Sequence, residues 1–95
     1  MEILGKILGS PARVKIMRLF LLNSKNGFSK KDIVKRSRVN SDAASREIKL
    51  LASIEFIKKH NTIWFFNPSF KYAKEFDKLL INSDSIVFLN KFYRS

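Results

Sequence analysis

The amino-acid sequence predicts a small, mainly α-helical domain that carries one β-hairpin. Residues 28–51 have the pattern of two short helices around a tight turn. Residues 56–66 contain two aromatic and β-branched runs around a polar turn, which is the pattern of a hairpin. A chain of 95 residues is long enough for one hydrophobic core with little surplus stability. We therefore expect a single core built from helices and this hairpin.

The N-terminal part is predicted to be helical. Apolar residues of segment 3–8 recur at helical spacing, and Gly9 can end that segment. Ser10 and Pro11 then supply a capping hydroxyl and a proline at the first position of a new helix. This helix should run to about residue 23, before a loop over residues 23–27. Its apolar face is wide, so we expect it to lie at the centre of the domain.

The first helix of the 28–51 pair has a complete start signal. The Ser29 hydroxyl can accept a hydrogen bond from the backbone N–H of Asp32, and the Asp32 carboxylate can accept one from the N–H of Ser29. Phe28 and Ile33 stand one residue before and four residues after this cap, at the spacing of a hydrophobic staple. We expect residues 36–39 to form the turn that follows.

The second helix of the pair is expected to begin after Asn40, whose side chain can cap it. Ala44, Ile48 and Leu51 follow the spacing i, i+4, i+7 and predict a packed face. A polar stripe occupies the other face: Asp42, Ser45, Arg46, Lys49 and Ser53. Its hydroxyl, guanidinium and ammonium donors suit phosphates and base edges, so the layout indicates a helix-turn-helix DNA reader. The alternative is an ordinary solvated helix face.

The predicted hairpin carries polar and cationic residues at or near its tip: Lys58, Lys59, His60 and Asn61. A hairpin that follows a DNA-reading helix corresponds to the wing of a winged helix-turn-helix, and its tip would meet phosphate or a minor groove. For each of these residues a solvated hairpin end is the alternative. The aromatic run 64–66 could stack on bases, as in proteins that bind single strands. In a small domain, however, side chains that alternate between the two faces of a strand favour core or subunit packing.

The C-terminal part is predicted to form two more helices. The run 67–69 (Asn-Pro-Ser) predicts the start of a helix that reaches about Ile81, with Phe70, Phe76 and Leu80 among its apolar residues. A last segment over 83–93 is apolar nearly all round, so it needs a partner surface. We therefore divide the chain into a DNA-binding domain (residues 1–67) and C-terminal helices (68–95) that dimerise or begin a further domain.

Charge narrows the class of partner. The chain has 19 Lys and Arg against 8 Asp and Glu, a net charge of +11 and a pI near 10.3. Residues 1–27 and 28–49 carry +4 each, so the excess lies in the N-terminal half. A field of this sign implies acidic partners, with nucleic acid ahead of an anionic membrane surface.

Several function classes are excluded by residue content. The chain has no cysteine, which removes disulfides and thiol catalysis and fits a reducing cytoplasm. No apolar run has the length of a signal peptide or membrane span, so we expect a soluble cytoplasmic protein. His60 is the only histidine and has no companions for a metal site. With no nucleophile and base pair and no phosphate loop, we expect no enzyme, cofactor or metal.

The segment 8–20 (LGSPARVKIMRLF), together with the order of the predicted elements, resembles the prokaryotic ArsR-like winged helix-turn-helix transcriptional regulators. The resemblance covers roughly residues 7–67. It implies dimers formed through N- and C-terminal helices. Two positions that are often glycine in this group, one in the turn and one at a helix end, are Arg38 and Glu55 here. The Cys, His and carboxylate clusters of metal-sensing members are missing, so metal sensing is not implied. The resemblance also implies major-groove contacts from Ser41, Ala43, Ser45, Arg46 and Lys49.

Together these observations predict a sequence-specific regulator that binds double-stranded DNA as a homodimer. Arg46 and Lys49 are the expected main readers, assisted by Ser41 and Ser45. Phosphate contacts are expected from Lys30, Lys31, Arg38 and the hairpin tip. The expected dimer interface comprises Ile3, Ile7, Phe76, Leu80, Val87, Phe88 and Phe92. The alternative is a winged-helix protein-interaction or oligomerisation module. Some relatives carry a nucleotidyltransferase-like domain after the helix pair, and the chain would then be an N-terminal fragment of such a protein.

Overall fold

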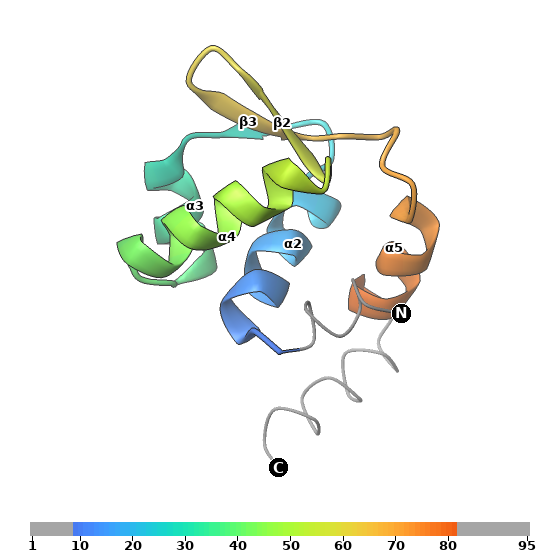
Figure 1. Ribbon diagram of the computed structural model, residues 1–95, viewed down its shortest axis with the longest axis horizontal. Helices are drawn as coiled ribbons and strands as arrows, with labels where there is room; N and C mark the ends of the chain where they lie inside the picture. The colour runs from blue at the N-terminus through green and yellow to red at the C-terminus, as the bar shows by residue number, and fades with distance from the viewer. Residues whose placement is uncertain (1–8, 82–95) are drawn as a thin grey trace.

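The computed structural model describes residues 9–81, which form four helices and a three-stranded antiparallel sheet (Figure 1). The predicted combination of helices with a β-hairpin is confirmed. The segments 3–8 and 83–93, predicted to be helical, lie outside the described residues. The helices are α2 (Pro11–Leu22), α3 (Lys30–Ser37), α4 (Ser41–Ser53) and α5 (Ala73–Ile81). The strands are β1 (Gly27–Phe28), β2 (Ile57–His60) and β3 (Ile63–Phe66).

Helix α2 is the centre of the domain, as its wide apolar face predicts. The Ser10 hydroxyl accepts a hydrogen bond from the backbone N–H of Arg13 at 3.2 Å, and Pro11 occupies the first helical position. Ile16 and Phe20 are fully buried. α2 contacts α3, α4 and α5, which surround it in Figure 1. The core therefore sits around α2, below the sheet in this view.

Helices α3 and α4 begin where their capping residues predict. Ser29 Oγ accepts from the Asp32 N–H at 3.2 Å, and the Ser29 N–H donates to Asp32 Oδ2 at 3.3 Å. Asn40 Oδ1 accepts from the backbone N–H of the third helical residue of α4 at 2.7 Å. The predicted turn is shorter than expected, because residues 36 and 37 complete the last turn of α3. Arg38 then reverses the chain in the left-handed region, with φ 55° and ψ 47°.

A third strand, β1, pairs with the hairpin. Its Gly27 was expected in a loop, and its Phe28 was expected just before the cap of the next helix. β1 pairs with β3, with Gly27 opposite Phe65 and Phe28 opposite Trp64, so β3 is the central strand. A Cβ atom on Gly27 would lie 2.5 Å from Phe65 Cζ, closer than real Cβ contacts allow. Glycine is therefore required where the Phe65 ring covers the backbone of β1. A strand of two residues has no periodicity that a sequence could reveal.

Helix α5 begins later than predicted, because the run 67–69 forms a turn that is tied to the end of α4. Asn67 Oδ1 accepts from the Ser69 N–H at 3.0 Å, and Asn67 Nδ2 donates to the Glu55 carbonyl at 2.8 Å. Glu55 itself has a φ of 64°, so it turns the chain after α4 in the left-handed region. Phe70 then enters the core, and α5 starts at Ala73.

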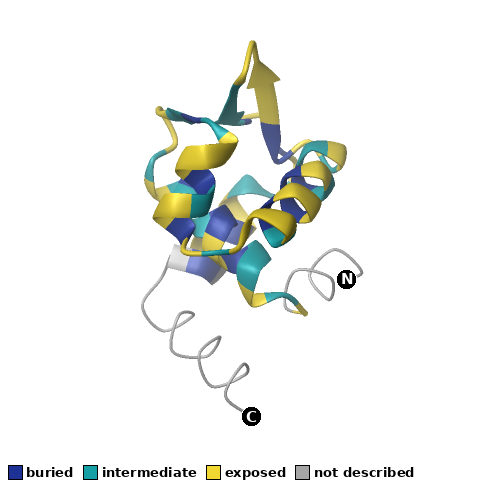
Figure 2. Cartoon of the chain, turned by 90° about the vertical axis from the view of Figure 1, so that its left-hand side faces the viewer, coloured by how far each residue is buried: buried dark blue, intermediate teal, exposed yellow. Residues whose placement is uncertain are grey.

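Two residues assigned to the dimer interface belong to the core of the chain. Phe76 is 1% exposed and Leu80 is 0% exposed, and both join the cluster around Phe20. Neither side chain can offer surface to a partner, so their assignment to the interface is wrong. The predicted boundary at residue 67 also divides one hydrophobic core, because α5 packs on α2. Figure 2 shows buried residues gathered among the helices while the hairpin projects from them.

Candidate nucleic-acid interface

Helix α4 presents its two faces as the spacing predicts. Ala44, Ile48 and Leu51 are buried against the core. Ala43 is half-buried, so part of its methyl group is accessible. The exposed residues of α4 carry hydrogen-bond donors along the length of the helix: Ser41, Ser45, Arg46, Lys49 and Ser53, with Asp42 in the first turn. The Ser53 hydroxyl donates to the Leu50 carbonyl at 2.6 Å, and the other exposed residues of this polar stripe are accessible to another molecule.

A two-point ion pair, which the sequence analysis missed, fixes α4 against α2. Arg13 Nε donates to Glu47 Oε2 at 2.6 Å and Arg13 Nη2 donates to Glu47 Oε1 at 3.1 Å. The Ser10 hydroxyl donates to Glu47 Oε2 at 3.4 Å. The two charged side chains are only 15% and 9% exposed. The sequence does contain a sign of this pair. Glu47 follows Ala44 by three residues, so a carboxylate lies on the packed face of α4, where it needs a partner.

The hairpin places its cationic residues at the outer end of the sheet. β2 and β3 are joined by Asn61 and Thr62, and His60 pairs with Ile63. Asn61 has a φ of 59°, a left-handed conformation that asparagine tolerates better than most residues. The predicted tip residues are all exposed, and Figure 2 shows the exposed end of the hairpin extending beyond the helices. These residues are Lys58, Lys59, His60 and Asn61.

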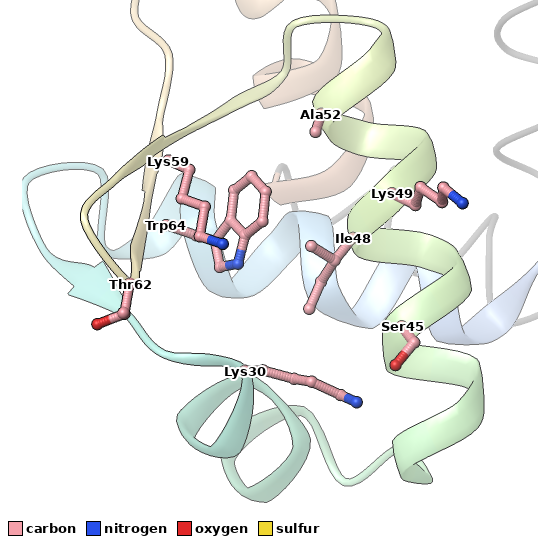
Figure 3. Close-up of a pocket in the computed structure, with 8 residues that line it drawn as sticks. All are labelled: Lys30, Ser45, Ile48, Lys49, Ala52, Lys59, Thr62 and Trp64. Atoms are coloured by element: carbon pink, nitrogen blue, oxygen red, sulfur yellow. The ribbon is translucent and has the colours of Figure 1, made fainter.

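A hollow of about 440 Å³ lies between α4, the hairpin and the start of α3 (Figure 3). The Trp64 ring points from β3 toward α4, and the Lys30 side chain extends from α3 toward Ser45. Lys59 Nζ lies 5.5 Å from the centre of the Trp64 ring. The Lys49 ammonium points to the outer side of α4. The residues that line this α4–hairpin hollow are Lys30, Ser45, Ile48, Lys49, Ala52, Lys59, Thr62 and Trp64.

The structure brings together only part of the predicted site. Lys30, Ser45, Lys49 and Lys59 share the α4–hairpin hollow, whereas Thr62 and Trp64 are lining residues that the sequence analysis did not assign to DNA binding. Lys31 is exposed on the first turn of α3. Arg38 instead lines a second hollow, between α2 and α3, with three other cations: Lys15, Arg18 and Arg36. This second hollow shares no lining residue with the first.

The aromatic residues of β3 divide between core and surface. Phe66 packs edge-on against Phe56, with ring centres 5.3 Å apart, which agrees with the core interpretation. Trp64 is half-buried, because one part of the ring packs on the core and another lines the α4–hairpin hollow. His60 is exposed at the end of β2. Within residues 9–81, no three His, Asp or Glu side chains gather into a group that could hold a metal ion.

Comparisons with known proteins identify no relative of this chain. No family model, curated protein or solved structure matches the chain. In the described part of the chain, no helix combines the length and the apolar character needed to cross a membrane.

Proposed function

We propose that this domain is a winged helix-turn-helix that binds double-stranded DNA sequence-specifically and regulates transcription as a dimer. One observation carries the proposal: the polar stripe of α4 and the cationic end of the hairpin flank the same hollow. The major groove of B-DNA admits an α-helix, and base edges are read there by polar side chains. A hairpin beside that helix can then contact the neighbouring backbone or minor groove. The resemblance of segment 8–20 to ArsR-like regulators supports the same assignment.

The proposed readers lie on the stripe of α4. The Arg46 guanidinium is exposed and can donate two parallel hydrogen bonds to a guanine edge, and Lys49 can donate to the same acceptors one turn later. The hydroxyls of Ser41 and Ser45 assist at neighbouring positions. The accessible methyl of Ala43 suits apolar contact with a thymine methyl group.

The proposed phosphate contacts surround these readers. Lys30 and Lys31 begin α3, and Lys58 and Lys59 lie on β2, so two neighbouring elements add cations beside α4. The Arg13–Glu47 pair is neutral as a whole, so the cations of α3, α4 and β2 are left in excess on this surface. DNA binding should therefore depend strongly on salt.

Dimerisation is part of the proposal and rests on residues outside the described part of the chain: Ile3, Ile7, Val87, Phe88 and Phe92. A two-fold dimer would present two α4 helices to half-sites about 10 base pairs apart, one turn of the duplex. Sedimentation should show a dimer at micromolar concentration, and Phe88→Glu combined with Phe92→Glu should give a monomer. A wild-type chain that sediments as a monomer contradicts the dimer.

The primary test is fluorescence anisotropy with labelled random duplex DNA over a range of salt concentrations. If all six exposed cations of α3, α4 and β2 named above reach phosphates, log K should fall with log salt with a slope of about −5. The control variant Lys78→Ala removes one charge from α5 and should leave this slope unchanged. A slope near zero, or no binding at low salt, refutes DNA binding and favours a winged helix that serves as a protein-interaction module.

A second test distinguishes base recognition from phosphate neutralisation. It uses a DNA site selected from a random duplex library. Arg46→Ala should cost about 1–3 kcal/mol on the selected site and much less on random DNA. Lys30→Ala should weaken both about equally and reduce the magnitude of the salt slope by about one. Equal losses on both DNAs for Arg46→Ala would reduce Arg46 to a phosphate contact and move the search for readers to Ser45 and Lys49.

A further inference from the structure

The α4–hairpin hollow has the chemistry of a small-molecule site as well as that of a nucleic-acid surface. Its floor is apolar and aromatic, formed by Ile48, Ala52 and the Trp64 ring. It also carries ammonium groups: Lys59 lies beside the Trp64 ring, and Lys30 extends toward Ser45. Its volume of about 440 Å³ falls in the range of ligand pockets. An occupant that fits this hollow needs an apolar, aromatic body and a negative charge.

The charges of the hollow are unbalanced. Lys30 of α3 and Lys59 of β2 supply its ammonium groups, whereas that of Lys49 points away from it (Figure 3), and the described lining residues include no carboxylate. In the described part of the chain the one ion pair within 4 Å is Arg13–Glu47, which involves none of these lysines. Lys59 lies over the face of the Trp64 ring at 5.5 Å, where the π-electrons attract its ammonium. An anion bound beside Trp64 would therefore meet Lys59 already in place.

A duplex strand offers phosphates to these lysines but little apolar surface to the floor. An aromatic carboxylate offers both, because its ring can pack on Trp64 and Ile48 while its carboxylate accepts from the lysine ammonium groups. We propose that the α4–hairpin hollow binds a small aromatic carboxylate. We also infer that such a ligand lowers the affinity for DNA, an effect that rests on the proposed function. Both ligands would require Lys30 and Lys59, so they exclude one another.

The single tryptophan of the chain makes the test direct, because its indole N–H gives one NMR signal. The probe is biphenyl-4-carboxylate, titrated into the full chain labelled with ¹⁵N. At ordinary efficiency per atom, a ligand of this size binds with a Kd of about 1 mM. We expect a saturable shift of the Trp64 indole signal and of the Ser45 and Thr62 amides.

Matched ligands and variants test each half of the recognition. The uncharged biphenyl-4-carboxamide and the ringless anion acetate should each bind at least about tenfold more weakly than the carboxylate. Lys59→Gln and Lys30→Gln should each weaken binding about tenfold, whereas Lys78→Gln on α5 should not. Equal binding of carboxylate and carboxamide, or of wild type and the two lysine variants, would overturn the proposed site.

The regulatory half is tested by competition. Anisotropy of bound duplex DNA should fall as biphenyl-4-carboxylate saturates the hollow, with a midpoint that tracks the Kd from NMR. Simultaneous binding of ligand and DNA would overturn the competition and leave the site itself intact. A Trp64 signal that shifts with duplex DNA and not with the carboxylate would overturn the site and leave DNA binding intact, assigning the hollow to the path of a DNA strand.

Discussion

The ion pair between Arg13 and Glu47 should be a main source of stability for α4. We expect Arg13→Met to lower the free energy of unfolding, because it leaves the Glu47 carboxylate 9% exposed without its cation. Exposed ion pairs contribute about 0–1 kcal/mol, and removal of one partner from a buried pair costs about 3–5 kcal/mol. Two short hydrogen bonds at 15% and 9% exposure place this pair between those limits, at about 2–3 kcal/mol. For a domain of this size that corresponds to a fall in Tm of about 10–20 °C.

The assay is urea unfolding followed by Trp64 fluorescence and by far-UV circular dichroism. A double-mutant cycle uses Arg13→Met, Glu47→Met and the double variant. Its coupling energy separates the contribution of the pair from other contacts of either side chain. The double variant should be more stable than Arg13→Met alone, because it leaves no uncompensated charge. The denaturant slope m should stay constant, since the surface exposed on unfolding is unchanged. A coupling energy below about 0.5 kcal/mol would refute the role of the pair in fixing α4.

Three further substitutions can be tested in the same unfolding assay. Gly27→Ala should destabilise the domain by about 1–3 kcal/mol, because the new Cβ meets the Phe65 ring, and an unchanged midpoint would contradict the close approach of β1. Arg38→Gly should stabilise it by about 0.5–1 kcal/mol, since glycine adopts a φ of 55° without strain; a loss of stability would point to a contact of the Arg38 side chain. Asn40→Ala should cost about 1 kcal/mol through loss of the α4 cap, and a neutral result would mean that another acceptor replaces it.

The sequence predicted those features that depend on neighbouring residues. The caps at Ser29 and Asn40 and the two faces of α4 involve residues within one or two helical turns, so spacing alone reveals them. The hairpin follows from alternation over 56–66 with a polar turn. Arg38 and Glu55 both adopt positive φ angles, the left-handed conformation that favours glycine, so these two positions turn the chain despite their side chains.

The features that the sequence did not reveal depend on distant parts of the chain. Gly27 pairs with Phe65, and Arg13 pairs with Glu47, across dozens of residues. No local pattern distinguishes a glycine that will be covered by an aromatic ring from a glycine in an open loop. The strand pattern favours core or subunit packing for Trp64, but its place in a hollow depends on where α4 comes to lie. Such juxtapositions are set by tertiary packing, which a residue pattern does not contain.

The strand order exposes β2 to pairing with strands of other molecules. β2 lies at one edge of the sheet, so one side of its backbone has no partner strand among the described residues. An unpaired edge can template the addition of strands from other molecules, and lysines on an edge strand oppose this because two copies repel. Lys58 and Lys59 therefore protect the edge whether or not DNA is bound. Neutralising both at once should promote aggregation, so the proposed DNA binding is best tested with one lysine substituted at a time.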